Sequence, residues 1–151
     1  MARAQIPDGV HADYANEEVQ ETLRTLQQTP DYDHLAAFLT SLREGYLVID
    51  VTGTSTKRGP RVRTIRSTKG QLVLPLFTSM AELRAAIPAK DQEHLKGAVM
   101  VAREALALIS SDRFVAAEID KASASLVILR KYISLAAGDD PITPETLEQM
   151  R

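Results

Sequence analysis

The sequence contains no cysteine and no tryptophan, and only 5% of its residues are aromatic. Without cysteine the chain has no disulfide framework, no thiolate metal site and no cysteine nucleophile. The scarcity of aromatic side chains removes most of the material for stacking nucleic-acid bases or for building an aromatic cage. These absences argue against a disulfide-stapled domain and against a base-stacking nucleic-acid-binding protein.

Long apolar runs and a strong charge imbalance are absent as well. The longest apolar run, around residues 98–102, is far shorter than the ~20 residues that a membrane-spanning helix needs. The opening residues MARAQIPDGVHADYANEE lack the apolar region of a signal peptide. The formal net charge is only −2, so no overall field attracts the chain to nucleic acid or anionic lipid. We therefore expect a cytoplasmic protein without membrane or nucleic-acid partners.

A chain of 151 residues is long enough for one domain with a substantial core. Residues 1–15 show no periodicity and are predicted to form a loose N-terminal arm, followed by one domain over residues 16–138. Residues 139–151 are predicted to add a C-terminal helix, because Thr143 can cap it and Pro144 suits its first position. The predicted fold class is α+β: an N-terminal helical hairpin followed by a mixed sheet of five to six short strands with interspersed short helices.

The helical hairpin is predicted from its caps and breaks. Asn16 can cap the first helix and Pro30 stops it. Asp31 or Asp33 can cap the second helix, and Gly45 suits the left-handed position that ends it. The apolar stripe of the first helix consists of Val19, Leu23 and Leu26.

Six short runs rich in β-branched and aliphatic residues are predicted to be strands. They are residues 46–51, 61–66, 71–77, 98–102, 113–119 and 125–130. The second and third runs are predicted to form a hairpin with its turn at Lys69 and Gly70. Because Pro75 cannot donate to a ladder, the strand over 71–77 is expected to be an edge strand or to be bulged.

The step from strand to helix in QLVLPLFTSMAELRAAIP, residues 71–88, has two interpretations. Ser79 followed by Glu82 predicts a capping box, in which Thr78 and Ser79 only begin the helix. The same helix start offers free N–H groups that favour an anion. Thr78 and Ser79 are therefore also candidates for a site that binds an amino acid or a phosphorylated metabolite.

One segment of the chain has an uneven charge. Between residues 51 and 81 there are six basic residues and no acidic one: Lys57, Arg58, Arg61, Arg63, Arg66 and Lys69. Arg61 and Arg63 would share a strand face. This basic hairpin could hold an acidic protein partner, a phosphorylated ligand or other small anion, or a nucleic-acid backbone. Alternatively, its charges serve only to discourage edge-to-edge strand pairing.

Other catalytic and metal signatures are missing. His11, His34 and His94 have no partner at a metal-ligand spacing, so no metal site or cofactor is expected. Glu118 and Asp120 are interpreted as side chains on an exposed edge. The chain has neither a P-loop motif nor a GxSxG motif, so we expect no phosphate loop and no catalytic serine.

Several segments resemble the N-terminal domain of the SseB family, the enhanced serine sensitivity proteins. They are YLVIDV, LVLPLFTSMAELRA, AVMVAREALALI and FVAAEIDKASASLVILRKYI, in that order along the chain. The resemblance covers about residues 18–137, with Asp120-Lys121 where the family often has a proline after the first turn residue. It implies an α+β fold and supplies no catalytic residues.

Two functional hypotheses follow. The first is a non-enzymatic regulatory or protein-interaction module that uses the basic hairpin. The second is a metabolite sensor or enzyme with its pocket near Thr78 and Ser79. The amphipathic terminal helices also leave a homodimer open.

Overall fold

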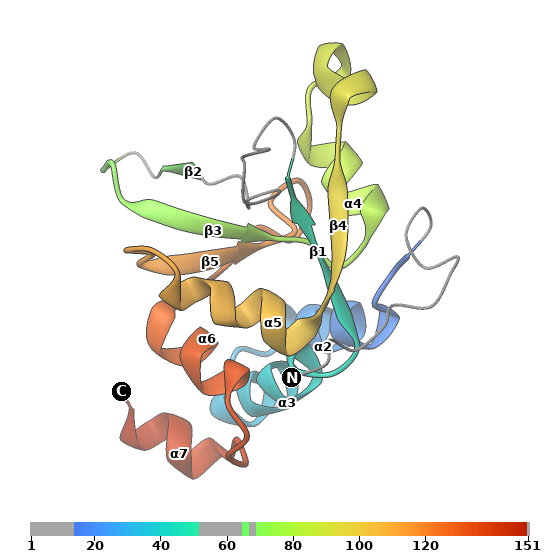
Figure 1. Ribbon diagram of the computed structural model, residues 1–151. Coiled ribbons are helices and arrows are strands. Elements are labelled where there is room, and N and C mark those ends of the chain that lie inside the picture. Colours follow the sequence, from blue (N-terminus) through green and yellow to red (C-terminus); the bar gives the residue numbers. More distant parts are fainter. Residues whose placement is uncertain (1–13, 52–64, 67–68, 151) are drawn as a thin grey trace.

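The computed structural model describes residues 14–51, 65–66 and 69–150 (Figure 1). The predicted site residues Lys57, Arg58, Arg61 and Arg63 lie outside these residues. The backbone of Arg66 is described, and its side chain is not.

The two N-terminal helices form the predicted hairpin. Helix α2 (Glu17–Gln28) begins after Asn16, whose side chain accepts a hydrogen bond from the amide of Val19, and α3 (Tyr32–Leu42) begins after Asp31. The two helices pack against each other. Gly45 has a φ of +71°, which turns the chain from α3 into the first strand as the sequence predicted.

The strands form two small sheets. Strands β1 (Tyr46–Asp50) and β4 (Gly97–Val101) pair antiparallel in the first sheet. The second sheet has the order β2-β3-β5-β6, with bounds Ile65–Arg66, Leu72–Leu76, Ala116–Ile119 and Leu126–Leu129. Strands β3 and β5 are parallel, and the other pairs are antiparallel. A bridge between Val48 and Phe77 connects the two sheets, so the α+β class is confirmed with the strands divided between them.

The expectation that residues 71–77 form an edge strand is wrong. Strand β3 lies between β2 and β5, and it pairs with both. Within the described residues the ladder with β2 consists of Val73 and Leu72, so Pro75 is not required to donate a hydrogen bond to it. The predicted hairpin between β2 and β3 is confirmed, and Gly70 adopts a φ of +77° in its turn.

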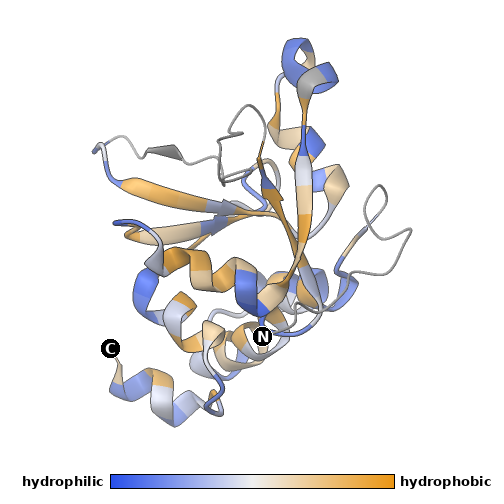
Figure 2. Cartoon of the chain, viewed as in Figure 1, coloured by the Kyte–Doolittle hydropathy of each residue, from blue (hydrophilic) through white to orange (hydrophobic). Residues whose placement is uncertain are grey.

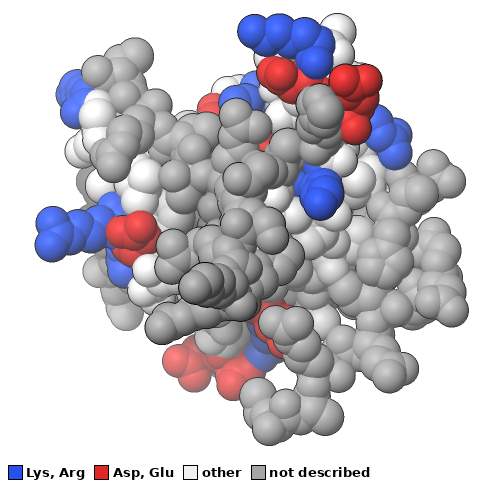
Figure 3. Space-filling model, turned by 45° about the horizontal axis from the view of Figure 1, so that its top comes forward, with Lys and Arg blue, Asp and Glu red and all other residues white. Residues whose placement is uncertain are grey.

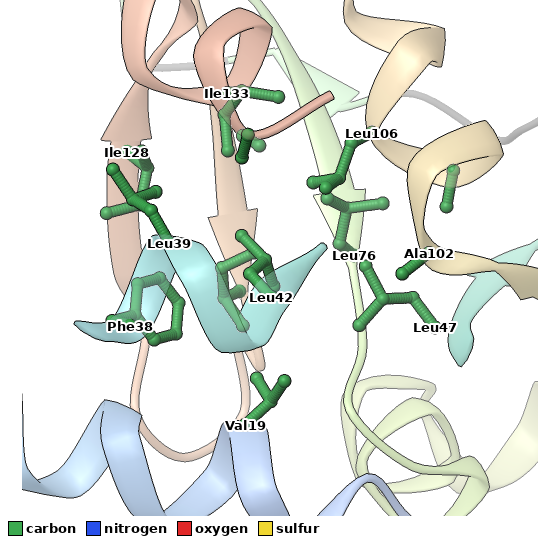
Figure 4. Close-up of a cluster of buried hydrophobic side chains, with 14 of the residues drawn as sticks. Val19, Phe38, Leu39, Leu42, Leu47, Leu76, Ala102, Leu106, Ile128 and Ile133 are labelled. Carbon is green, nitrogen blue, oxygen red and sulfur yellow. The ribbon is translucent and has the colours of Figure 1, made fainter. Parts of the chain in front are cut away.

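Most helices lie on one side of the second sheet (Figure 1). They are α2, α3, α5 (Ala102–Ala107) and α6 (Arg130–Ala137), and α7 (Pro144–Gln149) packs on α3. Hydrophobic residues are frequent in these strands and helices (Figure 2). Their buried side chains form the main core, including Phe38, Leu42, Leu76 and Ile133 (Figure 4). Because alternate residues of a strand point to opposite faces, this core uses Leu74 and Leu76 of β3.

A second, smaller cluster lies where α4 (Met80–Ala86) packs on β1. It contains Val48, Phe77, Met80, Leu83 and Val99. A short 3-10 helix over Ala89–His94 leads from α4 to β4.

Both ends of the described chain are attached to the core. Tyr14 and Ala15, which we assigned to the loose arm, contact the start of α4: the amide of Met80 donates to the carbonyl of Tyr14, and Ala15 forms a bridge with Ser79. At the other end, Thr143 caps α7 as predicted, and Leu147 is fully buried.

Candidate functional site

The candidate site lies where the two parallel strands of the second sheet end. Strand β3 continues through Phe77 to Thr78, and β5 is followed directly by Asp120. Because parallel strands end at the same edge of a sheet, residues 42 positions apart meet there. Thr78 is fully buried and Asp120 is 2% exposed.

Thr78 and Asp120 are joined by two hydrogen bonds. The amide of Thr78 donates to Oδ1 of Asp120 over 2.8 Å, and the Thr78 hydroxyl donates to Oδ2 over 2.6 Å. The side-chain amide of Gln20 in α2 donates to the same hydroxyl over 2.9 Å. The backbone of Asp120 has a φ of +50°, a left-handed conformation that aspartate adopts more readily than most residues. The cluster therefore connects α2, β3 and the turn after β5.

Burial raises the pKa of Asp120 to about 6. The two hydrogen bonds from Thr78 act in the opposite direction, since they favour the charged carboxylate, and the nearby carboxylate of Glu82 raises the pKa further. Desolvation is the largest of these effects. Asp120 is thus a carboxyl group that can change its charge near neutral pH while remaining inside the protein.

Ser79 begins α4 as the sequence predicted. Its hydroxyl accepts a hydrogen bond from the amide of Glu82 over 3.0 Å. The capping box predicted that the Glu82 carboxylate would reach back to the start of the helix; its Oε1 accepts instead from the hydroxyl of Ser123, over 2.6 Å. The amide of Ser123 donates in turn to the carbonyl of Asp120, so the turn after β5 is tied to α4.

Three main-chain amides at the start of α4 already have internal partners. The amide of Met80 bonds to Tyr14, the amide of Glu82 bonds to Ser79, and the amide of Thr78 bonds to a carboxylate. That carboxylate, from Asp120, lies at the N-terminal end of the helix, the position where a helix attracts an anion. The protein therefore supplies its own anion there, and a second negative group would be repelled by it.

Of the predicted site residues, the structure describes the surroundings of Thr78 and Ser79 but not those of most of the basic hairpin. Four of its six basic residues lie outside the described residues, whereas Arg66 lies in β2 at the end of the sheet and Lys69 lies in the turn that follows. Among the described side chains that Figure 3 shows, basic and acidic groups are interspersed. The role of the basic hairpin stays a prediction.

Asp120 is the residue that the sequence interpretation missed. We expected it on an exposed edge beside Glu118, yet it is buried, whereas Glu118 is partly exposed and accepts a hydrogen bond from Ser125. A usable signal existed in the sequence, because Thr78 and Asp120 each directly follow a predicted strand, over 71–77 and 113–119. Combining that signal with a parallel pairing of the two strands would have placed them together.

Within residues 14–51, 65–66 and 69–150, no group of three or more histidine or acidic side chains has the arrangement of a metal site. In the same residues, none of the helices has the length and apolar character required to cross a bilayer.

Comparison with known proteins gives one match. A family model described as the SseB protein N-terminal domain matches residues 19–133, which is well over half of the chain. The match begins in α2 and ends in α6, so it includes both strand ends that carry Thr78 and Asp120. Searches among curated proteins and among solved structures gave no match.

Proposed function

This chain belongs to the SseB N-terminal domain family, as its sequence resemblance predicted, and we propose that it is a non-enzymatic module that binds a protein partner through the basic hairpin. The observation that supports this proposal is the position of β2. This strand ends the second sheet, and the basic positions Arg61 and Arg63 directly precede it in the chain. The partner is expected to present acidic side chains.

The burial of Asp120 supports a non-enzymatic role. A general acid or base must reach the proton of a substrate, directly or through one water. Asp120 is 2% exposed, and both of its oxygens accept hydrogen bonds from Thr78. The raised pKa of Asp120 is explained by its burial, and we assign this residue a structural role at the ends of β3 and β5.

Charge removal at the hairpin tests the proposal. The variant Arg61→Ser/Arg63→Ser should lower the capture of the protein partner from cell extract by about tenfold, since two charge contacts are lost. The matched control is Lys90→Ser/Arg113→Ser, which removes two exposed cations elsewhere and should leave the capture unchanged. Raising the salt concentration should weaken capture by the unaltered chain, because contacts between exposed charges are screened. Equal capture by both variants would contradict the proposal.

The second candidate function is a sensor or enzyme for an amino acid or a phosphorylated metabolite near Thr78 and Ser79. Its support is the position of these residues at a helix start, beside a carboxyl group with a raised pKa. A thermal-shift screen with amino acids and phosphorylated metabolites tests it. A ligand-dependent rise in melting temperature that Thr78→Val abolishes would favour this function over the first.

A further inference from the structure

The turn between β5 and β6, residues 120–125, has an unusual backbone. Its first and last residues, Asp120 and Ser125, have φ angles of +50° and +49°. No other non-glycine residue in the described part of the chain has a positive φ. The left-handed conformation is costly for a residue with a side chain, and it persists where the surroundings hold the backbone in place. Both ends of this turn therefore relax when the contacts of the turn are lost.

Side-chain hydrogen bonds to three other elements hold the turn in this conformation. The carboxylate of Asp120 accepts two hydrogen bonds from Thr78, which follows β3. The hydroxyl of Ser123 donates to Oε1 of Glu82 in α4 over 2.6 Å. The side-chain amide of Gln27 in α2 donates to a carbonyl of the turn over 2.8 Å. The conformation of the turn thus depends on polar contacts, and the Asp120 carboxylate accepts two of them.

The turn has little apolar packing of its own. Residues 121–123 are exposed, and Ala124 is packed only partly against the main core. A segment with few buried apolar contacts opens locally at a lower free energy than the core unfolds. Loss of its polar contacts therefore allows the turn to detach while β5 and β6 remain paired.

The closed turn keeps a carboxyl group away from water and close to a second one. Asp120 is 2% exposed, and its burial raises its pKa to about 6. The carboxylate of Glu82 raises the pKa of Asp120 further, whereas the neighbours from β3 and α2 are the uncharged Thr78 and Gln20. The titratable side chains of the turn and of the elements next to it are Glu82 of α4, Glu118 of β5 and Lys121.

We propose that this turn opens and closes with pH: it is closed while Asp120 holds a proton, and its open state becomes more populated when Asp120 is ionised. The protonated carboxyl group keeps the closed contacts, because one oxygen accepts from the amide of Thr78 and the other can donate its proton to the Thr78 hydroxyl. The ionised carboxylate is disfavoured inside the protein beside Glu82. Opening moves it into water and relaxes both left-handed residues.

Opening of the turn changes the edge of the sheet where the parallel strands end. The hydroxyl of Thr78 and the side-chain amide of Gln20 become accessible to water, and α4 loses its hydrogen bond with Ser123. The equilibrium constant for opening should rise about 50-fold from pH 4 to pH 7, since Asp120 titrates near 6 in the closed state and near 3.8 in the open state. This response does not depend on the proposed binding through the basic hairpin.

Hydrogen exchange of the Thr78 amide, followed by NMR, tests the proposal. Thr78 is fully buried, and its amide donates to Asp120, so this amide exchanges only when the turn opens. Its exchange rate, corrected for the intrinsic effect of pH, should rise about 50-fold between pH 4 and pH 7. At every pH it should exchange faster than the amide of Val48, which bonds to Phe77 where the two sheets meet. Equal protection of the two amides would overturn the proposal, because the turn would then open only when the whole protein unfolds.

Three variants test the role of the Asp120 charge. Asp120→Asn tolerates the left-handed backbone and cannot ionise, so the protection of the Thr78 amide should no longer change with pH. Asp112→Asn alters an exposed aspartate outside the turn and is the matched control, which should keep the 50-fold change. Glu82→Gln keeps an acceptor for Ser123 and removes a charge, so the midpoint of the change should move to lower pH.

Two results with these variants would overturn the proposal. One is a pH-dependent exchange of the Thr78 amide that persists in Asp120→Asn. The other is a midpoint that Glu82→Gln leaves in place or moves to higher pH. Circular dichroism checks the fold of each variant, and Glu82→Gln decides alone if Asp120→Asn does not fold.

Discussion

The hydroxyl of Thr78 donates a 2.6 Å hydrogen bond to a carboxylate oxygen of Asp120, although the two residues are 42 positions apart. The bond connects the residues that follow the ends of the parallel strands β3 and β5. The amide of Thr78 donates to the other carboxylate oxygen, so each oxygen of Asp120 accepts a hydrogen bond. Even so, the energetic cost of removing the carboxylate from water exceeds what these bonds return, because the pKa of Asp120 is raised to about 6. Ionised Asp120 therefore lowers the stability of the fold.

The ionisation of Asp120 should lower the unfolding free energy as the pH rises from about 4 to about 6. The folded protein holds a proton on Asp120 up to a pKa of about 6, whereas the unfolded chain releases it near 3.8. The stabilisation by this bound proton is complete below the pKa of Asp120 in the unfolded chain. It is lost as the pH rises through the pKa of Asp120 in the folded protein, and its full size is about 3 kcal/mol. Urea unfolding of the unaltered chain at several pH values between 4 and 7 measures it.

Asp120→Asn is the comparison that isolates this effect, because other carboxyl groups also titrate in this range. Asparagine keeps the shape and tolerates the left-handed backbone of this position, yet it cannot ionise. The difference in unfolding free energy between the two proteins should therefore change with pH by about 3 kcal/mol in the direction given above. Curves that run parallel from pH 4 to 7 would show that Asp120 titrates normally.

The local features of this fold could be predicted from the sequence. The caps at Asn16, Ser79 and Thr143 are confirmed because each cap bonds to an amide only three residues away. The left-handed glycines Gly45 and Gly70 are confirmed for the same reason, since their neighbours in the chain determine the turn.

Features that depend on strand order could not be predicted in the same way. Whether residues 71–77 lie at an edge depends on which strands pair with them, and the inner position of β3 follows from its parallel pairing with β5. The burial of Asp120 has the same origin, because the turn after β5 is covered only when that strand lies beside β3. Likewise, the Glu82 carboxylate bonds to Ser123, a residue 41 positions away. Pairing across such distances leaves no periodic signal in the sequence.

Removal of the Arg43 guanidinium should destabilise the protein by about 2–4 kcal/mol. Arg43 follows α3 and is 7% exposed, and its guanidinium donates to the carbonyls of Leu135, Ala136 and Asp140 over 2.8–3.3 Å. Two of these carbonyls belong to the last turn of α6, where a cation also interacts favourably with the helix dipole. Arg43→Met leaves the carbonyls without their donor, and urea unfolding measures the loss.

Two variants control for this result. Arg113→Met removes an exposed arginine and should change the unfolding free energy by no more than about 0.5 kcal/mol. Arg43→Lys keeps the charge and loses the planar fork that serves three acceptors, so its stability should lie between that of Arg43→Met and the unaltered chain. If Arg43→Met were as stable as Arg113→Met, the contacts of Arg43 with α6 would contribute nothing to the fold.

A methyl group at Gly97 should be harmful because α4 approaches β4 closely at this point. A Cβ atom there would lie 2.7 Å from Cδ2 of Leu83 and 2.9 Å from Sδ and Cε of Met80. The neighbours are the ends of flexible side chains, so we expect Gly97→Ala to cost about 1–3 kcal/mol rather than to prevent folding. Gly138→Ala is the control, because its nearest contact of 3.5 Å is an ordinary one, and it should change stability by less than about 0.5 kcal/mol.

Combining Gly97→Ala with Leu83→Ala determines whether the close contact is the cause. Leu83 is fully buried, so Leu83→Ala alone should cost about 2–5 kcal/mol through the cavity it leaves. In the double variant the new methyl group occupies part of that cavity and the clash with Leu83 disappears. The total cost should then be at least about 0.5 kcal/mol smaller than the sum of the single costs in a double-mutant cycle. Strict additivity would mean that Gly97 is needed for its backbone and not for the approach of α4.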